Sequence, residues 1–116
     1  MVNNYRWNIF WADLSPARGS EQSGKRPVLV ISSESVNSAL PVVTVLPLTS
    51  AKPERHVYPT EAYLPYKSTG LSKDSIAMAH QIRSISIQRL VEQCGTIDDI
   101  ELRDKVKEAI RLYLGL

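Results

Sequence analysis

The chain has 116 residues, of which 43% are hydrophobic and 22% charged. This length predicts one domain over residues 1–116, and the composition is that of an ordinary globular protein. Its single cysteine, Cys94, excludes an intrachain disulfide and a multi-cysteine zinc site. The N-terminus lacks a signal-peptide pattern and no apolar run reaches membrane-spanning length, so we expect a cytoplasmic protein with no membrane partner.

The net charge of +2 is unevenly distributed along the chain. Residues 18–90 carry nine cations and five anions, a net charge of +4, whereas residues 91–116 carry four cations and six anions, a net charge of −2. This partition favours an anionic ligand bound away from the C-terminal segment. Scattered solvated charge is the alternative interpretation of so modest an imbalance.

Strands are predicted at residues 8–14, 27–32 and 42–48, each bounded by proline or glycine signals. In the second of these, the continuous apolar run of residues 28–31 indicates burial on both faces. Trp7 and Trp11 share the same parity along the first strand. We therefore expect core or subunit-interface residues there rather than platforms for base stacking.

The middle of the chain is more irregular. Residues 51–70 hold several prolines and predict a broken loop, with a short strand near residues 56–58. Residues 74–85 alternate well enough for one long strand or two short ones. One face would then carry Ile76, Met78, His80 and Ile82, and the other Ser75, Gln81 and Arg83.

Helices are expected late in the chain. Ser86 can cap a short helix that runs through Glu92, and Asp98 with Glu101 has capping-box spacing at the start of the last helix. An apolar stripe on that helix should pack on the sheet: Leu102, Val106, Ala109, Ile110, Tyr113 and Leu114. The pattern predicts a mostly β, α+β fold, with a small, curved, mostly antiparallel sheet closed by a C-terminal helix.

A polar loop bracketed by Gly19 and Gly24 delivers Lys25 and Arg26 to the start of the buried strand. The glycines permit tight turns and a close approach to a ligand, and Pro27 fixes φ at the strand entrance. Arg26 is therefore expected at the rim between a loop and a rigid core, which suits a cation that binds phosphate.

Five segments in sequence order make the chain resemble the MazF/PemK family of toxin endoribonucleases: Trp11–Pro16, Gly19–Ile31, Val43–Ser50, Gly70–Ile85 and Leu90–Leu116. The resemblance covers nearly the whole chain. It implies a small SH3-like barrel of the MazF/CcdB kind with a C-terminal helix, and a homodimer. No cofactor is implied.

The resemblance also implies an activity and a partner. The activity is sequence-specific, metal-independent cleavage of single-stranded RNA, including mRNA, in which the ribose 2′-OH attacks and leaves 2′,3′-cyclic phosphate and 5′-OH ends. Such cleavage inhibits translation and growth. The implied partner is a cognate MazE-like antitoxin with a disordered acidic and apolar segment, in a toxin–antitoxin hetero-oligomer.

Arg26 and Thr49 match the family's catalytic arginine and threonine. The guanidinium of Arg26 offers a planar fork for two phosphate oxygens, and the hydroxyl of Thr49 can donate to the same phosphate. A strand-end hydroxyl that caps its own turn is the alternative role for Thr49. No carboxylate pair or His/Cys cluster has a metal-ligand spacing, and we expect no metal.

The group that transfers protons stays open between Arg26, Glu21 and His80. A guanidinium is a poor base because its ordinary pKa exceeds 12. For Glu21 we favour an ion pair with Lys25 or Arg26 that orients the loop over a role as base. His80 stands where the family commonly has an acidic residue, and we favour a core or dimer-interface histidine slightly over a proton-transfer group.

Polar and basic side chains near these residues are candidates for binding RNA: Ser20, Gln22, Lys25, Ser50, Lys52, Gln81 and Arg83. Gln81 can read a base edge and Arg83 can bind phosphate or stack, the alternative being cross-strand pairing on a solvated face. Lys52 and Arg55 either extend a phosphate track or are ordinary surface cations.

Two other functions compete with RNA cleavage. One is a CcdB-like gyrase-binding toxin, which would use the helix end at residues 113–116. The other is a noncatalytic RNA-binding module. The intact pair of Arg26 and Thr49 has no role in gyrase binding and favours the endoribonuclease.

Overall fold

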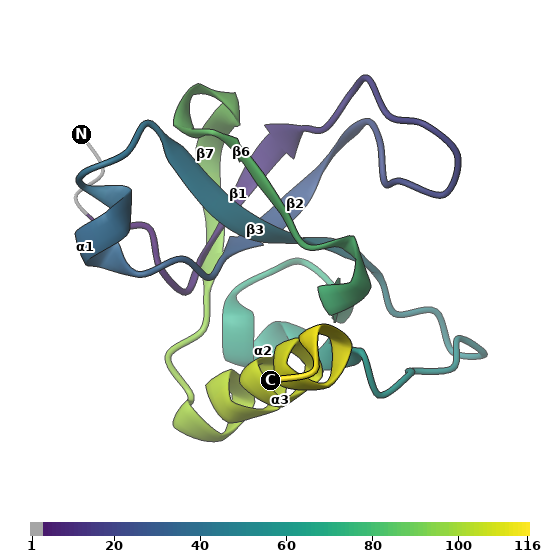
Figure 1. The fold of residues 1–116 in the computed structure, drawn as a ribbon. Coiled ribbons are helices and arrows are strands. Elements are labelled where there is room, and N and C mark those ends of the chain that lie inside the picture. Colours follow the sequence, from purple (N-terminus) through teal and green to yellow (C-terminus); the bar gives the residue numbers. More distant parts are fainter. Residues whose placement is uncertain (1–3) are drawn as a thin grey trace.

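The computed structural model describes residues 4–116, which form a rolled sheet with a helix against one side (Figure 1). Its elements are β1 (Asn8–Asp13), β2 (Lys25–Val30), α1 (Glu34–Asn37), β3 (Val42–Ser50), β4 (Glu61–Leu64), α2 (Tyr66–Thr69), β5 (Ser75–Met78), the 3₁₀ helix η1 (Ala79–Gln81), β6 (Arg83–Ser86), the 3₁₀ helix η2 (Ile87–Arg89), β7 (Leu90–Thr96) and α3 (Ile100–Leu114). In this part of the chain, no helix is both long and apolar enough to span a bilayer.

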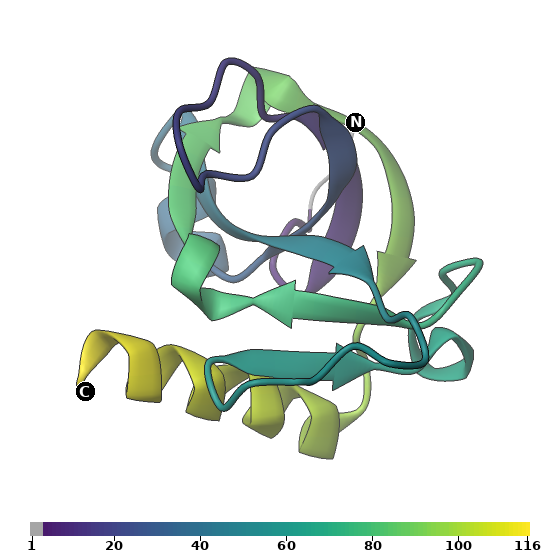
Figure 2. The ribbon, with the colours of Figure 1, turned by 90° about the vertical axis from the view of Figure 1, so that its right-hand side faces the viewer.

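The strands pair antiparallel in the order β4-β5-β3-β2-β1-β7, and β6 pairs with the first half of β3. The long strand β3 thus shares one edge between two neighbours, β6 along residues 42–45 and β5 along residues 48–50. The predicted mostly antiparallel sheet with a C-terminal helix is confirmed. The sheet curls strongly into a barrel-like form without closing (Figure 2).

Two clusters of buried side chains fill the two faces of the sheet. Within β2, Val28 and Val30 belong to the cluster inside the rolled sheet, whereas Leu29 belongs to the cluster beneath α3. All three side chains are fully buried, which confirms the predicted burial of this strand on both faces. Because Arg26 lies two residues before Val28, its backbone is anchored at the edge of this core.

The last helix begins one residue later than the capping box predicts. Asp99 is the N-cap, and its side chain accepts a hydrogen bond of 2.9 Å from the N–H of Glu101. Leu102, Val106 and Ala109 are buried, as the predicted stripe requires. The prediction is wrong for the final turn, where Tyr113 and Leu114 are 46% and 47% exposed because the helix extends past the sheet (Figure 2).

Residues 56–58 do not form the predicted strand; β4 follows at Glu61–Leu64 instead. The carboxylate of Glu61 accepts hydrogen bonds from the guanidinium of Arg55 and from the N–H of Tyr58. The backbone before β4 is therefore held by a buried carboxylate rather than by a strand partner.

Residues 74–85 form two short strands separated by η1, in agreement with the second of the two predicted arrangements. The predicted alternation of faces is wrong, because β5 is buried on both sides and the 3₁₀ turn at residues 79–81 interrupts the period. Ser86 does accept a hydrogen bond from the N–H of Gln88, but the helix ends at Arg89. Residues 90–96 extend as β7 because they pair with β1.

Candidate functional site

The loop between β1 and β2 carries Arg26 toward the middle of the molecule. Gly19 and Gly24 both adopt positive φ, at 57° and 77°, which is the backbone freedom that the sequence pattern predicts. The base of the loop is closed by a hydrogen bond of 3.0 Å from the N–H of Leu14 to the carbonyl of Gly24, and by another of 3.0 Å from the N–H of Gly24 to Ser15 Oγ. The loop therefore enters β2 in a defined direction.

Three side chains from the η1–η2 segment hold this loop in place. The amide of Gln81 donates to the carbonyl of Ser20 at 3.1 Å and accepts from the N–H of Gln22 at 3.2 Å. Arg83 donates to the carbonyl of Leu14 at 3.4 Å. Arg89 donates to the carbonyls of residues 13 and 15, at 2.9 and 3.1 Å. We call Gln81, Arg83 and Arg89 the loop latch.

Arg26 is half-buried and its guanidinium is held by two backbone carbonyls. Nε donates to the carbonyl of Ser23 at 3.2 Å, and Nη1 donates to the carbonyl of Leu48 at 3.1 Å. The second bond ties the start of β2 to the strand that carries Thr49. A guanidinium has five N–H donors, so these two contacts position the group while leaving donors for an anion.

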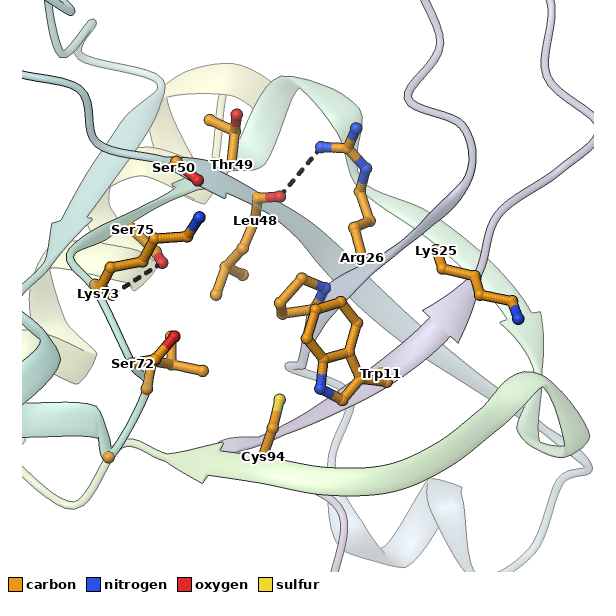
Figure 3. Close-up of a pocket in the computed structure, with 13 residues that line it drawn as sticks. Trp11, Lys25, Arg26, Leu48, Thr49, Ser50, Ser72, Lys73, Ser75 and Cys94 are labelled. Atoms are coloured by element: carbon orange, nitrogen blue, oxygen red, sulfur yellow. Dashed lines mark hydrogen bonds between the residues drawn. The ribbon is translucent and has the colours of Figure 1, made fainter.

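A cavity of about 540 Å³ opens at this point, and Arg26 and Thr49 both line it (Figure 3). One wall comes from β2, the floor from the end of β3, and the opposite wall from residues 70–75. The lining residues are Trp11, Lys25, Arg26, Pro27, Leu48, Thr49, Ser50, Gly70, Leu71, Ser72, Lys73, Ser75 and Cys94. The cavity thus offers hydroxyl donors and cations, the groups that bind phosphate.

Four of the predicted site residues share this lining: Lys25, Arg26, Thr49 and Ser50. Lys25 lies on its rim, and its ammonium points away from Arg26 (Figure 3). Ser20 and Gln22 lie in the loop and are bound to Gln81 through their backbone. The side chains of Gln81 and Arg83 are engaged by the loop in this structure rather than presented to a ligand.

Glu21 is exposed and its carboxylate accepts a hydrogen bond of 2.6 Å from the N–H of Arg18. Among residues 4–116, its carboxylate makes no ion pair with Lys25 or Arg26. The predicted ion pair is therefore wrong for this structure, where the carboxylate contacts the loop backbone instead. Glu21 is not among the described residues that line the cavity.

His80 is half-buried in η1, close to the buried ion pair of Arg55 and Glu61. Burial alone would raise the pKa of Glu61, but hydrogen bonds from Arg55 and Tyr58 and the nearby charges of Arg55 and His80 together lower it below 4.5. Arg55, predicted as a phosphate-track or surface cation, is instead paired with Glu61 at 2.6 Å.

Lys52 is exposed and lies beyond the cavity. His56 packs edge-on against Tyr58.

Several lining residues were not predicted as part of the site. Lys73 points into the cavity toward Ser50 from the wall opposite Arg26 (Figure 3). Trp11, 41% exposed, forms another side of the cavity, whereas Trp7 is buried in the core as expected. The pKa of the nearby Cys94 thiol is raised, chiefly by burial.

Within residues 4–116, His, Cys, Asp and Glu side chains form no group of three that could hold a metal ion.

Comparison with known proteins finds the same fold and family. Residues 5–114 match the sequence profile of the PemK-like, MazF-like toxin of type II toxin–antitoxin systems. Endoribonuclease EndoA of Bacillus subtilis is 40% identical over 111 residues, covering 96% of this chain and 94% of the relative. Endoribonuclease MazF9 of Mycobacterium tuberculosis is 40% identical over 116 residues, covering 96% of each.

Solved structures agree. The crystal structure of MazF (Form-I) from Deinococcus radiodurans superposes with a TM-score of 0.80 at 26% identity, covering 97% of both chains. The MazE–MazF (Form-II) structure from the same organism superposes with a TM-score of 0.75 at 26% identity, covering 100% of this chain and 99% of the other. The chain therefore belongs to the PemK/MazF family of toxin endoribonucleases from type II toxin–antitoxin systems.

Proposed function

We propose that this chain cleaves single-stranded RNA, including mRNA, at the cavity shared by Arg26 and Thr49, without a metal ion. The observation that carries the proposal is that Arg26 and Thr49, from neighbouring strands, line one cavity. The names of the two relatives at 40% identity support RNA as the substrate. By cutting mRNA in the cytoplasm, the protein would inhibit translation and growth.

In this reaction the ribose 2′-oxygen forms a bond to the adjacent phosphorus while the bond from phosphorus to the 5′-oxygen breaks. The 2′-OH loses a proton, the departing 5′-oxygen gains one, and the products are a 2′,3′-cyclic phosphate and a 5′-OH. The free N–H donors of Arg26 bind the phosphoryl oxygens and stabilise the added negative charge. The hydroxyl of Thr49 donates to the same phosphate and holds it in place.

Of the three groups considered for proton transfer, only Arg26 is among the described residues that line the cavity. Glu21 is bound to the loop backbone and His80 lies beside Glu61. We therefore assign proton transfer to a concerted exchange through the Arg26 guanidinium in the transition state. Neither Glu21 nor His80 is needed for the step.

Cleavage of a mixed pool of single-stranded RNA in EDTA tests the proposal. Wild-type protein should give discrete cuts whose 5′-OH ends accept label from polynucleotide kinase without prior phosphatase treatment. Arg26→Ala should be folded and inactive, because loss of such charge stabilisation costs about 3–4 kcal/mol in the barrier. Thr49→Ala should cleave slowly.

Near-normal cleavage by folded Arg26→Ala would overturn the mechanism. Binding of the pool by the wild-type protein without any cuts would instead favour a noncatalytic RNA-binding module. Failure to bind or to cut RNA would favour the gyrase-binding alternative.

We further propose that the protein is a homodimer neutralised by a MazE-like antitoxin. Apolar side chains exposed outside the core support a subunit contact: Trp11, Val91, Leu112, Tyr113, Leu114 and Leu116. An acidic and apolar antitoxin segment would bury apolar side chains and also meet the cations around the cavity. The MazE–MazF structure of Deinococcus radiodurans supports a partner of this kind.

RNA and antitoxin should then exclude each other. Increasing salt should weaken RNA binding more than antitoxin binding, because RNA depends on phosphate contacts whereas the antitoxin also buries apolar groups. Native gel shifts of the antitoxin complex with added RNA measure this directly. A ternary complex that still cleaves RNA would contradict the arrangement.

A further inference from the structure

A second hollow, of about 500 Å³, adjoins the cavity of Arg26 and Thr49. Ser50, Ser72 and Lys73 line both spaces, so the two meet at the turn before β5. Beyond this turn the second hollow is bounded by Lys52 and Tyr66. A polymer seated at Arg26 could therefore continue into the second hollow without leaving the surface.

Lys73 stands where the two hollows meet. Its side chain is exposed and reaches toward Ser50 (Figure 3). Among residues 4–116, it makes no ion pair. The neighbouring carboxylate of Asp74 is already engaged, since it accepts from the hydroxyl of Tyr63 and, at 2.8 Å, from the N–H of Tyr66. These bonds also brace the turn that presents Lys73.

Tyr66 gives the second hollow an aromatic wall. It is 46% exposed, and its backbone rather than its ring makes the contact to Asp74. The ring can therefore stack on a base without breaking that contact. Lys52 adds a second exposed cation to the same hollow. A cationic groove with an aromatic platform is the combination that binds single-stranded nucleic acid with little sequence preference.

We propose that the second hollow is a subsite for the nucleotide next to the cut, with its phosphate bound by Lys73 and its base stacked on Tyr66. This inference rests on the proposed function and extends it from the reacting phosphate to its neighbour. Arg26 and Thr49 act on the bond that breaks, whereas Lys73 and Tyr66 bind substrate. Their loss should therefore weaken RNA binding and leave the chemical step largely intact.

The probe is a fluorescein-labelled RNA that contains the cleavage sequence found for the wild-type protein, with 2′-deoxyribose before the cut so that it cannot react. Its affinity is measured by anisotropy over a series of salt concentrations. Each phosphate contact to single-stranded nucleic acid contributes about 0.7 to the slope of log K against log salt. Lys73→Gln should lower the slope by about 0.7.

Lys67→Gln is the matched control, because Lys67 is an exposed lysine on the neighbouring helix α2 and is not among the described residues that line either hollow. It should leave the slope unchanged. Tyr66→Ala should weaken binding about tenfold at constant salt, which is within the range measured for loss of one base stack. Tyr66→Phe retains the ring and should restore the affinity.

An unchanged salt slope in Lys73→Gln would overturn the subsite, even if wild-type protein cleaves RNA and Arg26→Ala does not. The subsite would also be overturned if Lys73→Gln weakened binding of poly-glutamate but not of RNA, because the hollow would then serve an acidic peptide. Failure of the proposed function is recognised separately, by a wild-type protein that makes no metal-independent cuts.

Discussion

Arg26 is held in position before any ligand arrives. Its Nε and Nη1 donate to the carbonyls of Ser23 and Leu48, so in the proposed mechanism the side chain would lose little further freedom on binding phosphate. An ammonium group has neither the planar fork nor the geometry to keep both contacts. The proposed role of Arg26 in binding phosphate therefore depends on the shape of the side chain as well as its charge.

Arg26→Lys should consequently separate chemistry from binding. We expect the single-turnover cleavage rate to fall on the order of 10²- to 10³-fold, while RNA affinity falls less, because the charge is retained. Rapid-quench kinetics measures the cleavage rate, and anisotropy measures the affinity for the same RNA. Arg18→Lys, an exposed change in the same loop, serves as the control. A lysine variant with wild-type kinetics would rule out a role for the fork.

His80 should affect stability rather than proton transfer. It is half-buried in η1 beside the ion pair of Glu61, away from the cavity wall. His80→Gln should keep the shape of the pH–rate profile between about pH 5 and 8 and lower the melting temperature. The exposed His56→Gln should change neither. Loss of one limb of the profile at an unchanged melting temperature would reverse this assignment.

At the scale of elements, the loop latch joins the segment between β5 and β7 to the β1–β2 loop. Gln81 bonds to the loop on both sides of Glu21, while Arg83 and Arg89 bind its first residues. All these contacts are to loop backbone, so the latch holds the loop whatever side chains it carries. The sequence motif around Gln81 thus has a structural role beside its predicted contact with RNA, which stays a prediction.

Gln81→Leu should loosen the loop without unfolding the sheet. We expect faster proteolysis within residues 14–24 and a lower kcat, since Arg26 follows directly after this loop. Gln88→Leu is the control, because Gln88 is an exposed glutamine of the adjacent η2 helix. Equal proteolysis rates for the two variants would mean that the latch does not restrain the loop. Loss of RNA affinity alone, with an unchanged kcat, would point to base reading instead.

Local sequence patterns were enough to predict the elements whose buried residues form an unbroken run or a regular stripe. The continuous apolar run of β2 and the helical spacing of the apolar stripe on α3 are both strong local signals, and both elements are present. In contrast, β7 has exposed residues at 91–93 and becomes a strand through pairing with β1. Such pairings are set by tertiary register, which no local pattern contains.

The residues of the site also divide into those that the sequence could predict and those that it could not. Arg26 and Thr49 could be predicted because each lies in a recognisable motif, and the structure brings both to one cavity. Lys73 could not be predicted, because it reaches the cavity through the pairing of β3 with β5. The ion pair between Arg55 and Glu61 could not be predicted either, since several carboxylates at different distances along the sequence were possible partners for Arg55.

For the molecule as a whole, the buried pair of Arg55 and Glu61 should contribute to stability in a pH-dependent way. The side chain of Glu61 is 0% exposed and that of Arg55 28%. Because the pKa of Glu61 is lowered by folding, the contribution is complete above the ordinary value of 4.5 and is lost as pH falls through the lower, folded value.

Glu61→Gln should therefore reduce the free energy of unfolding by about 2–3 kcal/mol at pH 7. The difference from wild type should shrink at an acidic pH below 4.5, as the native carboxylate takes up its proton. Urea unfolding followed by circular dichroism at the two pH values measures both effects. Glu54→Gln, an exposed change in the same loop, should have little effect at either pH. A constant difference at the two pH values would indicate lost packing rather than a lost charge.

Sedimentation velocity should detect a dimer at micromolar concentration. The apolar side chains left exposed at the end of α3 and on β7 favour association, and an apolar contact should persist in high salt. A monomer under these conditions would remove the support for a homodimer.

The pairing of β1 with β7 has a consequence for the newly made toxin. Residues 8–13 pair with β2 on one side, but the partner strand on their other side is residues 90–96, near the far end of the sequence. The cavity itself needs side chains from Trp11 to Cys94. Such long-range contacts form slowly and late. A nascent chain therefore cannot present the complete cavity until residues as far along as Cys94 have been made.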